Sequence, residues 1–369
     1  MERLFVNVKT ALFIVEHISD IYIVYDCGCA SKRSTDYIDN AIDKVFPTGC
    51  TIEAVFISHY DSDHINGIHH LLNHCKIKRL ILPMIPNAVL LYLLSNQSYN
   101  KEEEEFILAP EKYIQRKDLH TEILYVRNDN EENELNSAPI SFDGLTNRFS
   151  SRELPSGIKI SVNDFHWAFI PYNIRILSKT EETEFMDLLA KSISVPLDEL
   201  KKTNIEDVWR KHDLDIKSAV NKCLGGLNNK AFNGTSMTLY SGPWIKERVR
   251  GNIGSLYLGD YDAKAHYDKL EIAYKEVMDL VGIVQIPHHG SLSYFDDRLI
   301  KLNRLAVISV SMPNGKINPK ETIDKILELN GMPLVTGYRG DILIYTMRIY
   351  NEDCTEFIDI LKIGHVTVS

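Results

Sequence analysis

The stretch at residues 57–64, ISHYDSDH, places two histidines and two aspartates within six positions. It follows the apolar run AVF at residues 54–56 and precedes residues 65–76, INGIHHLLNHCK, whose apolar positions are near helical spacing. This order predicts a strand, then a loop, then a helix. We therefore expect His59, Asp61, Asp63 and His64 to gather on a loop at the end of a strand.

The composition is that of a globular protein with a sizeable core, since 44% of the 369 residues are hydrophobic and 25% are charged. No apolar run approaches the roughly 20 residues that span a bilayer, and the N-terminal segment reads as strands rather than as a signal peptide. The six cysteines lack the density and spacing of a disulfide scaffold. We expect a cytoplasmic protein without a membrane partner.

The net charge of −10 argues against a protein that coats nucleic acid through a general basic surface. It does not exclude a nuclease. Two bound divalent cations would add roughly four positive charges at the place where an anionic substrate must lie.

The order of elements predicts a layered α/β sandwich. Both halves of the chain alternate short apolar runs with helical patterns, and strand ends carry His or Asp. Residues from about 174 to 230 are instead rich in Glu, Lys, Leu and Asp, which predicts a helical insertion or lid. We expect one domain over residues 1–369 that contains this insertion.

Two further strand ends carry ligand-type residues. An apolar run ends in Gly259 and Asp260, and another ends in His288 and His289 before a glycine. Imidazole and carboxylate bind zinc, manganese and similar ions, and an open coordination position makes bound water a nucleophile. Three strand ends that converge in this way predict a dinuclear metal site.

Simpler interpretations compete with this one. The 59–64 cluster could be a polar turn that caps the next helix, and Asp260 could be a helix N-cap. His69, His70 and His74, on the helix after the motif, are expected at the surface or in the core rather than on a metal.

The order of Asp26 in YDCG, then HYDSDH, then GD, then PHHGS resembles the metallo-β-lactamase superfamily, and most closely the hydrolase domain of ComEC-type competence proteins. NGTSMTLYS at residues 233–241 is similar to the strand that precedes GD in that group. The resemblance covers most of the chain apart from the acidic segment and the helical insertion. It implies a four-layered αβ/βα sandwich.

The resemblance also implies roles for individual residues. His59 and Asp61 would bind one divalent ion, Asp63 and His64 the other, with Asp260 as the bridge and His288, in preference to His289, completing the second site. Asp63 and Asp260 would be the catalytic carboxylates, and the two ions would be zinc or manganese. Residues implied to support the ligands or contact substrate are Asp26, His289, Ser291, Asn233 and Asn318.

Two features depart from the family pattern. Asn318 and Pro319 stand where members often have a His-Pro pair. The third ligand of the first metal has no diagnostic motif, although His166, Tyr172 and Asn173 lie near the expected place in the sequence.

The resemblance favours a metal-dependent phosphodiesterase, first of all a nuclease on DNA or RNA, which works through a dinuclear site and metal-activated hydroxide. The cationic stretch at residues 244–252, WIKERVRGN, is a candidate contact for nucleic acid. Three alternatives stay open. They are hydrolysis of a small phosphodiester or nucleotide, hydrolysis of an amide, lactam or thioester, and a catalytically weak subunit that depends on a protein partner in an antiphage defence system.

Overall fold

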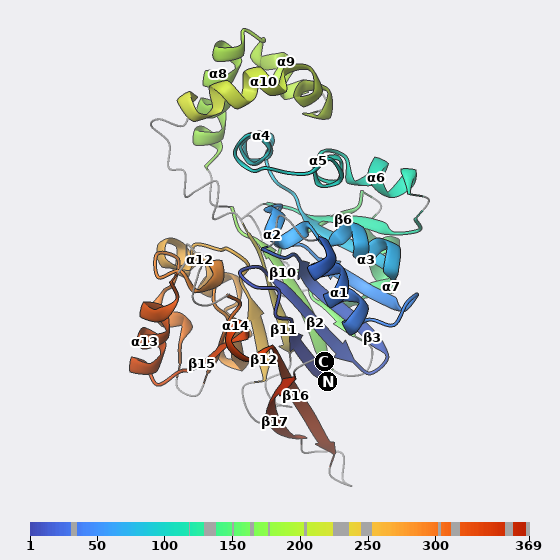
Figure 1. The fold of residues 1–369 in the computed structure, drawn as a ribbon, viewed down its shortest axis with the longest axis vertical. Coiled ribbons are helices and arrows are strands. Elements are labelled where there is room, and N and C mark those ends of the chain that lie inside the picture. Colours follow the sequence, from blue (N-terminus) through green and yellow to red (C-terminus); the bar gives the residue numbers. More distant parts are fainter. Residues whose placement is uncertain are drawn as a thin grey trace.

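The computed structural model describes residues 1–30, 35–117, 119–128, 138–149, 151–162, 166–175, 178–202, 205–223, 236–244, 253–301, 304–310, 318–350 and 357–366. Within them two β-sheets pack face to face, with helices on both outer faces (Figure 1). The predicted α/β sandwich is confirmed.

The first sheet has the strand order β17-β16-β1-β2-β3-β4-β5-β6-β8. Its strands are β1 (Glu2–Phe5), β2 (Phe13–Ile18), β3 (Ile21–Cys27), β4 (Thr51–Phe56), β5 (Lys76–Pro83), β6 (Glu122–Val126), β8 (Glu153–Leu154), β16 (Asp341–Tyr350) and β17 (Phe357–Val366). The run from β3 to β6 is parallel. The loops after these strands therefore leave from the same edge.

The second sheet has the order β15-β14-β13-β12-β11-β10-β9-β7. Its strands are β7 (Ile140–Ser141), β9 (Ile160–Val162), β10 (Trp167–Asn173), β11 (Met237–Pro243), β12 (Gly254–Tyr257), β13 (Val281–Gln285), β14 (Leu305–Ile308) and β15 (Met332–Val335). Strands β12 to β15 are parallel, so the GD and PHHGS segments also leave from one edge.

Helices of the first half cover the first sheet. They are α1 (Thr35–Val45), α2 (Ser62–Ile65), α3 (Ile68–His74), α4 (Asn87–Asn96), α5 (Lys101–Leu108) and α6 (Pro110–Arg116). The next helix, α7 (Phe142–Arg148), contacts β7 and β9 of the second sheet. The helices that follow β12 are α12 (Ala263–Ala273), η3 (Met278–Leu280), η4 (His288–Gly290), η5 (Asp297–Leu299), α13 (Lys320–Glu328) and α14 (Thr336–Arg339). Among the described residues, no helix is long and apolar enough to cross a membrane.

Three further helices lie in the segment where the composition predicts an insertion: α8 (Lys179–Ile193), α9 (Leu197–Lys202) and α10 (Ile205–Cys223). They form the end of the molecule opposite the β16–β17 hairpin (Figure 1). Phe185, Leu189 and Trp209 from these helices belong to the same buried cluster as Leu91 of α4. The inserted helices are thus packed onto the rest of the protein through α4.

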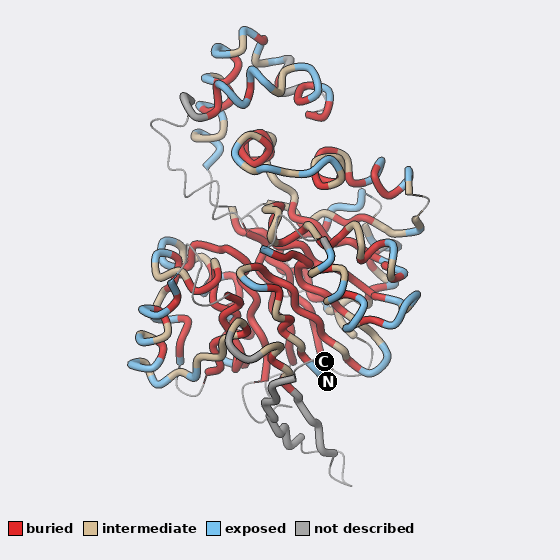
Figure 2. Tube along the Cα trace, viewed as in Figure 1, coloured by how far each residue is buried: buried red, intermediate tan, exposed pale blue. Residues whose placement is uncertain are grey.

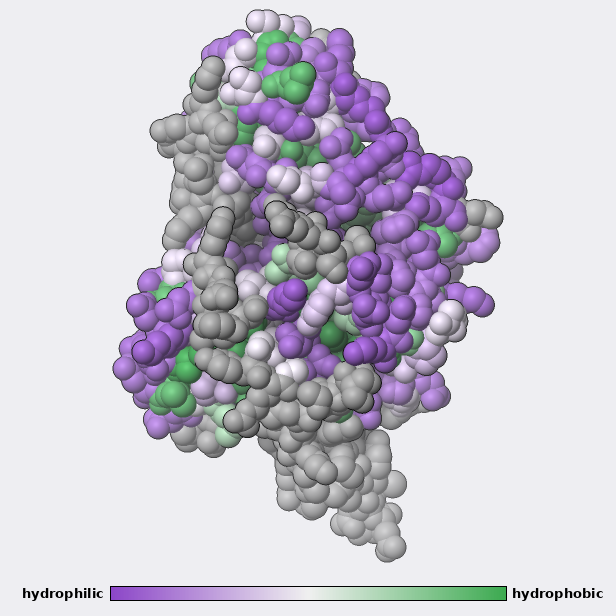
Figure 3. All heavy atoms as spheres, viewed as in Figure 1, coloured by the Kyte–Doolittle hydropathy of each residue, from purple (hydrophilic) through white to green (hydrophobic). Residues whose placement is uncertain are grey.

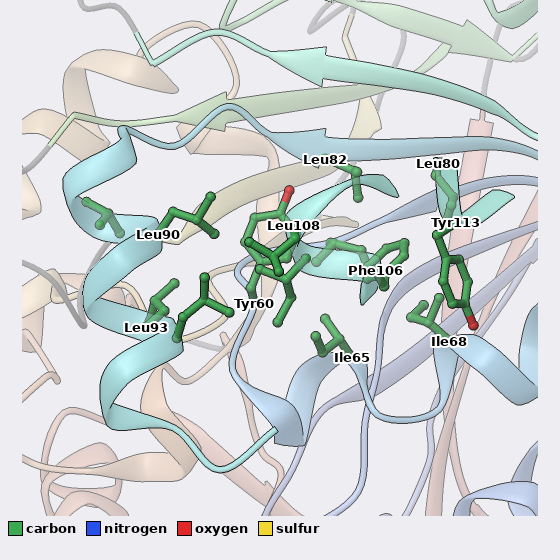
Figure 4. Packing of buried hydrophobic residues seen from close by; sticks show 14 of the residues in the cluster. Tyr60, Ile65, Ile68, Leu80, Leu82, Leu90, Leu93, Phe106, Leu108 and Tyr113 are labelled. Carbon is green, nitrogen blue, oxygen red and sulfur yellow. The ribbon is translucent and has the colours of Figure 1, made fainter. Parts of the chain in front are cut away.

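Buried residues follow the strands of both sheets (Figure 2). Their apolar side chains form clusters between the sheets and under both helical layers. Phe56, Phe169 and Tyr257 belong to the layer between the sheets. Burial of such a side chain contributes about 1.5–3 kcal/mol. Under α4, α5 and α6, the side chains of Tyr60 and Ile65 pack with Phe106 and Leu108 (Figure 4). This contact holds the ISHYDSDH loop between β4 and the helices above it.

Cross-links between the sheets fix the edge where the motif loops meet. Tyr25 OH donates to Met237 O (2.8 Å), and Met237 N donates to Ser58 O (2.7 Å). In the second sheet, His288 N donates to Gly259 O (3.1 Å). The three strand ends that carry ligand-type residues are therefore hydrogen-bonded into one assembly.

Candidate metal centre

The ISHYDSDH loop is held against the end of β3 by a close backbone approach. A Cβ atom at Gly28 would lie 1.9 Å from Asp63 O, so only glycine permits this contact. Asp61 occupies the N-cap position of α2 but makes no capping hydrogen bond with its side chain. The capping interpretation of this cluster is therefore wrong for Asp61.

The capping interpretation is also wrong for Asp260. The N-cap of α12 is Asp262, whose Oδ1 accepts from Ala265 N at 3.0 Å. Asp260 instead turns toward the histidines of the first sheet. Gly259 before it has a φ of +55°, and a Cβ there would lie 2.7 Å from the Ser58 side chain. The glycine lets the β12 loop reach the ISHYDSDH loop.

Two clusters of ligand-type atoms result, and they share His64. In the first, Asp260 Oδ2 lies 3.8 Å from His59 Nε2, and Asp260 Oδ1 lies 3.4 Å from His64 Nε2. Asp61 Oδ2 lies 3.9 Å from His59 Nε2. In the second, His289 Nε2 lies 3.1 Å from Asp63 Oδ2 and 3.9 Å from Asp260 Oδ1.

The geometry favours His289 over His288 as the histidine that faces Asp63 and His64. His289, rather than His288, joins Asp63 and His64, because its Nδ1 is bonded to Ser309 O (3.1 Å) and its Nε2 then faces inward. His288 lies at the mouth, 30% exposed, with Nε2 3.7 Å from Asp260 Oδ2. Both residues have left-handed φ values, +47° and +53°, so the chain turns tightly and presents the second ring to the interior.

Asp26 supports the histidine loop from behind. Its Oδ2 lies 2.8 Å from His64 Nδ1, and its two oxygens also accept from Ser58 N (2.7 Å) and Ser58 Oγ (2.6 Å). His59 Nδ1 is held by Ser58 Oγ (2.9 Å) and Ser236 Oγ (3.2 Å). Both rings thus have their Nδ1 atoms engaged and their Nε2 atoms directed at Asp260, as metal-ligating histidines do.

The electrostatics are those of crowded, buried carboxylates. Burial, with the neighbouring charges of Asp63 and Asp260, raises the pKa of Asp61 to about 8. Burial and the proximity of His64 lower the pKa of His59 to about 3. Burial alone would raise the pKa of Asp63. The hydrogen bond from His289 and the charges of His64 and His289 outweigh burial and lower this pKa to about 2.

The residues fit divalent cations. Among the side chains that the structure describes, His59 Nε2, His64 Nε2, Asp61 Oδ1 and Asp260 Oδ1 are buried without a hydrogen-bond partner. Each such atom costs about 1–3 kcal/mol when unsatisfied. Imidazole nitrogens and carboxylate oxygens that converge in this way are the donor set of zinc and manganese.

The other predicted residues lie around this centre or outside the described residues. Ser291 Oγ contacts Ser293 Oγ (2.9 Å), and the exposed Asn318 accepts from Lys320 N (3.1 Å) at the start of α13. Asn233 and residues 245–252 lie outside the described residues.

Two of the three residues considered as a third ligand of the first metal lie elsewhere. His166 precedes the first residue of β10, whereas Asn173 ends that strand at the site edge, about 20 Å away at about 3.3 Å per residue. Tyr172 packs its ring against Tyr274. Asn173 uses its Nδ2 to bind Met84 O and Val126 O, both at 2.8 Å. Asn173 is therefore a brace between loops.

Sequence reasoning missed Gln97 and Tyr99, which follow α4. Gln97 Nε2 donates to Asp61 Oδ2 at 3.0 Å. Burial raises the pKa of Tyr99 well above its usual value, and the nearby charges of Asp61 and Asp63 add to the effect. The polar stretch around them carries no signal that distinguishes it from a surface loop.

Residues 8–118 match the family model of the metallo-beta-lactamase superfamily. Similar solved structures include the metallo-beta-lactamase fold protein YhfI from Bacillus subtilis, with 9% identity, a TM-score of 0.40, and coverage of 90% of this chain and 96% of that one. They also include human tRNase Z, short form (8%, TM-score 0.37, coverage 91% and 92%), and a diphosphatase from the PhnP family (10%, 0.35, 91% and 87%). No curated protein matches the sequence.

The matched segment contains Asp26 and the whole ISHYDSDH loop, and the two flanked sheets supply Asp260 and His289 at the same edge. Members of this superfamily are metal-dependent hydrolases. The chain is thus similar to the metallo-β-lactamase superfamily over residues 8–118, and its two sheets with helices on both outer faces have the metallo-β-lactamase fold.

Proposed function

We propose that this protein is a metal-dependent phosphodiesterase, and first of all a nuclease on DNA or RNA. The ligands of its dinuclear centre would be His59, Asp61, Asp63, His64, Asp260 and His289. The observation that carries the proposal is the position of Asp260, whose Oδ2 faces His59 while its Oδ1 faces His64 and His289. A carboxylate whose two oxygens face different histidines is suited to bridge two cations.

The carboxylates favour phosphodiester chemistry over amide chemistry. Asp61 stands where most of the superfamily has histidine, so three aspartates contribute to the centre. Oxygen-rich sites suit the harder ions that commonly serve phosphoryl transfer. We therefore prefer the substrate class that the ComEC-type resemblance implies, a phosphodiester in DNA or RNA.

Divalent cations held there would supply Lewis-acid activation of water and neutralise charge that develops on a phosphate. The chain itself orients the donors. Asp26 and Ser58 fix the His64 and His59 rings, and Gln97 holds Asp61 from the α4 side. His288 is 30% exposed at the mouth of the centre, where its ring would be placed to contact the phosphate.

The test is cleavage of labelled single-stranded DNA, double-stranded DNA and RNA with Mn²⁺, Zn²⁺ or Mg²⁺. Asp260→Asn is compared with the wild type and with Asp268→Asn, an exposed aspartate on α12 that pairs with Arg298. We expect activity in the wild type and in the control, and a loss of at least about 100-fold in Asp260→Asn. Equal cleavage by Asp260→Asn would refute the proposal.

A second candidate substrate is a small phosphodiester or nucleotide, which could occupy a cavity of about 530 Å³ that also contains Glu182, the ion-pair partner of Arg175. Arg127, Arg175 and Asn87 line it, and so does Met84, which Asn173 binds. A cavity of this size accommodates one nucleotide. Hydrolysis of cyclic mononucleotides without polymer cleavage, weakened by Arg175→Ala, would establish this alternative.

A further inference from the structure

A second group of histidines and aspartates lies where α1 crosses α3, away from the dinuclear centre. Asp39 and Asp43 are one turn apart on α1, and His70 and His74 are one turn apart on α3. Gly67 permits the helices to approach, since a Cβ there would lie 2.6 Å from the Ile38 side chain. Hydrophilic residues cover the described surface over these helices (Figure 3).

Both rings converge on one carboxylate oxygen. Asp43 Oδ1 lies 2.9 Å from His70 Nε2 and 3.1 Å from His74 Nδ1. One ligand atom from each of these three residues lies within 4.8 Å of the other two. The side chains of Asp43, His70 and His74 are 51%, 29% and 10% exposed, so water can reach the group.

The remaining ring nitrogens are held by acceptors. His74 Nε2 lies 2.8 Å from Phe46 O, and because a carbonyl only accepts, this nitrogen carries the proton. His74 Nδ1 in a neutral ring is then a lone pair that faces the Asp43 carboxylate. His70 Nδ1 lies 3.5 Å from Asp39 Oδ1. Metal-ligating histidines usually donate their second ring N–H to a carbonyl or a carboxylate, as Phe46 O and Asp39 would accept here.

The two rings lie with their centroids 5.7 Å apart and are nearly parallel, with an interplanar angle of 22°. Their inward nitrogens and Asp43 Oδ1 therefore face one common point. One divalent cation there would be bound by all three ligand atoms.

From this geometry we infer that Asp43, His70 and His74 form a separate binding site for one divalent cation, with zinc the best match to two imidazoles and one carboxylate. Water completes the coordination. The ion joins α1 to α3, the helix that follows the ISHYDSDH loop, and so stabilises the base of that loop from outside. The site does not depend on the proposed nuclease activity.

The experiment counts zinc in protein that has been stripped with chelator, reloaded and desalted. The double variant His70→Gln/His74→Gln is compared with His69→Gln, a control on the same helix whose ring bonds Tyr113 OH at 2.8 Å. We expect one equivalent of zinc fewer in the double variant and no change in the control. Zinc should also raise the Tm of an Asp260→Asn protein less when His70 and His74 are replaced.

Crystals soaked in zinc give a direct readout, as an anomalous peak between Asp43, His70 and His74. Asp43→Asn serves as the second variant if the double variant does not fold, because Asp43 is half exposed. Equal zinc content in the wild type and in these variants, or an anomalous map without this peak, would overturn the inference.

Discussion

The centre at the sheet edge and the group between α1 and α3 use the same residue types but differ in what surrounds them. At the sheet edge His59 and His64 are almost fully buried and their inward nitrogens have no hydrogen-bond partner among the described residues. Between α1 and α3 both inward nitrogens already face the half-exposed Asp43. Burial therefore makes the first arrangement costly without cations, whereas the second can exist as an ion-pair network.

The largest expected effect separates the two adjacent histidines of the sheet-edge centre. His289→Ala removes an inward nitrogen, so we expect loss of one metal equivalent and a fall in phosphodiesterase activity of about 100-fold or more. His288→Ala should retain both metals and lose about 10-fold in activity. Metal content and kcat measured on both variants check this. If His288→Ala alone lost a metal, the assignment of the two rings would be reversed.

The contrast between buried and exposed charge can be tested on stability as well. Glu16 is buried, where it accepts from Arg3 Nε (3.1 Å) and Ser241 Oγ (2.6 Å) and also contacts Tyr257 OH. Glu16→Ala removes the carboxylate that pairs with the buried Arg3 guanidinium, so we expect a loss of about 3–5 kcal/mol in the free energy of unfolding.

Glu2→Ala is the control for that experiment, since Glu2 is 48% exposed in its contact with His17. Its effect should stay within about 0.5 kcal/mol. Urea unfolding followed by circular dichroism measures both variants. Similar losses in the two would show that burial does not set the cost of removing a charge here.

A smaller effect is expected from the residue behind the histidines. Asp26→Asn keeps a hydrogen-bonding side chain but removes the carboxylate that accepts from His64 Nδ1, so metal affinity should fall by about 10–100-fold. Competition of the protein with a chelating dye for zinc measures the change. An unaltered affinity would mean that the ring is oriented without this carboxylate.

The smallest effect is expected between α1 and α3. In metal-free protein, Asp43→Asn should change the free energy of unfolding by no more than about 1 kcal/mol, because exposed ion pairs contribute little. With zinc present the difference should widen. A loss of several kcal/mol in the metal-free state would remove the contrast between the two clusters.

The fold class could be predicted from the sequence, and so could the segments that meet at the candidate site, because the end of a strand can be recognised from nearby residues. An apolar run that stops at His59, Gly259 or Pro287 marks a strand end, and parallel strands bring such ends to one edge. Which of His288 and His289 faces the interior could not be predicted from the sequence, because it depends on the left-handed φ values of both residues. The roles of Gln97 and Asn173 were hidden for a related reason, because each acts through a contact between segments distant in sequence.

The central claim is that Asp260 bridges two cations. Electron paramagnetic resonance of the manganese-loaded protein tests it directly, because two Mn²⁺ ions that share a carboxylate are exchange-coupled. We predict a coupled multiline signal in the wild type that is lost in Asp260→Asn and kept in Asp268→Asn. A wild-type spectrum that contains only the six lines of isolated Mn²⁺ ions would contradict the claim.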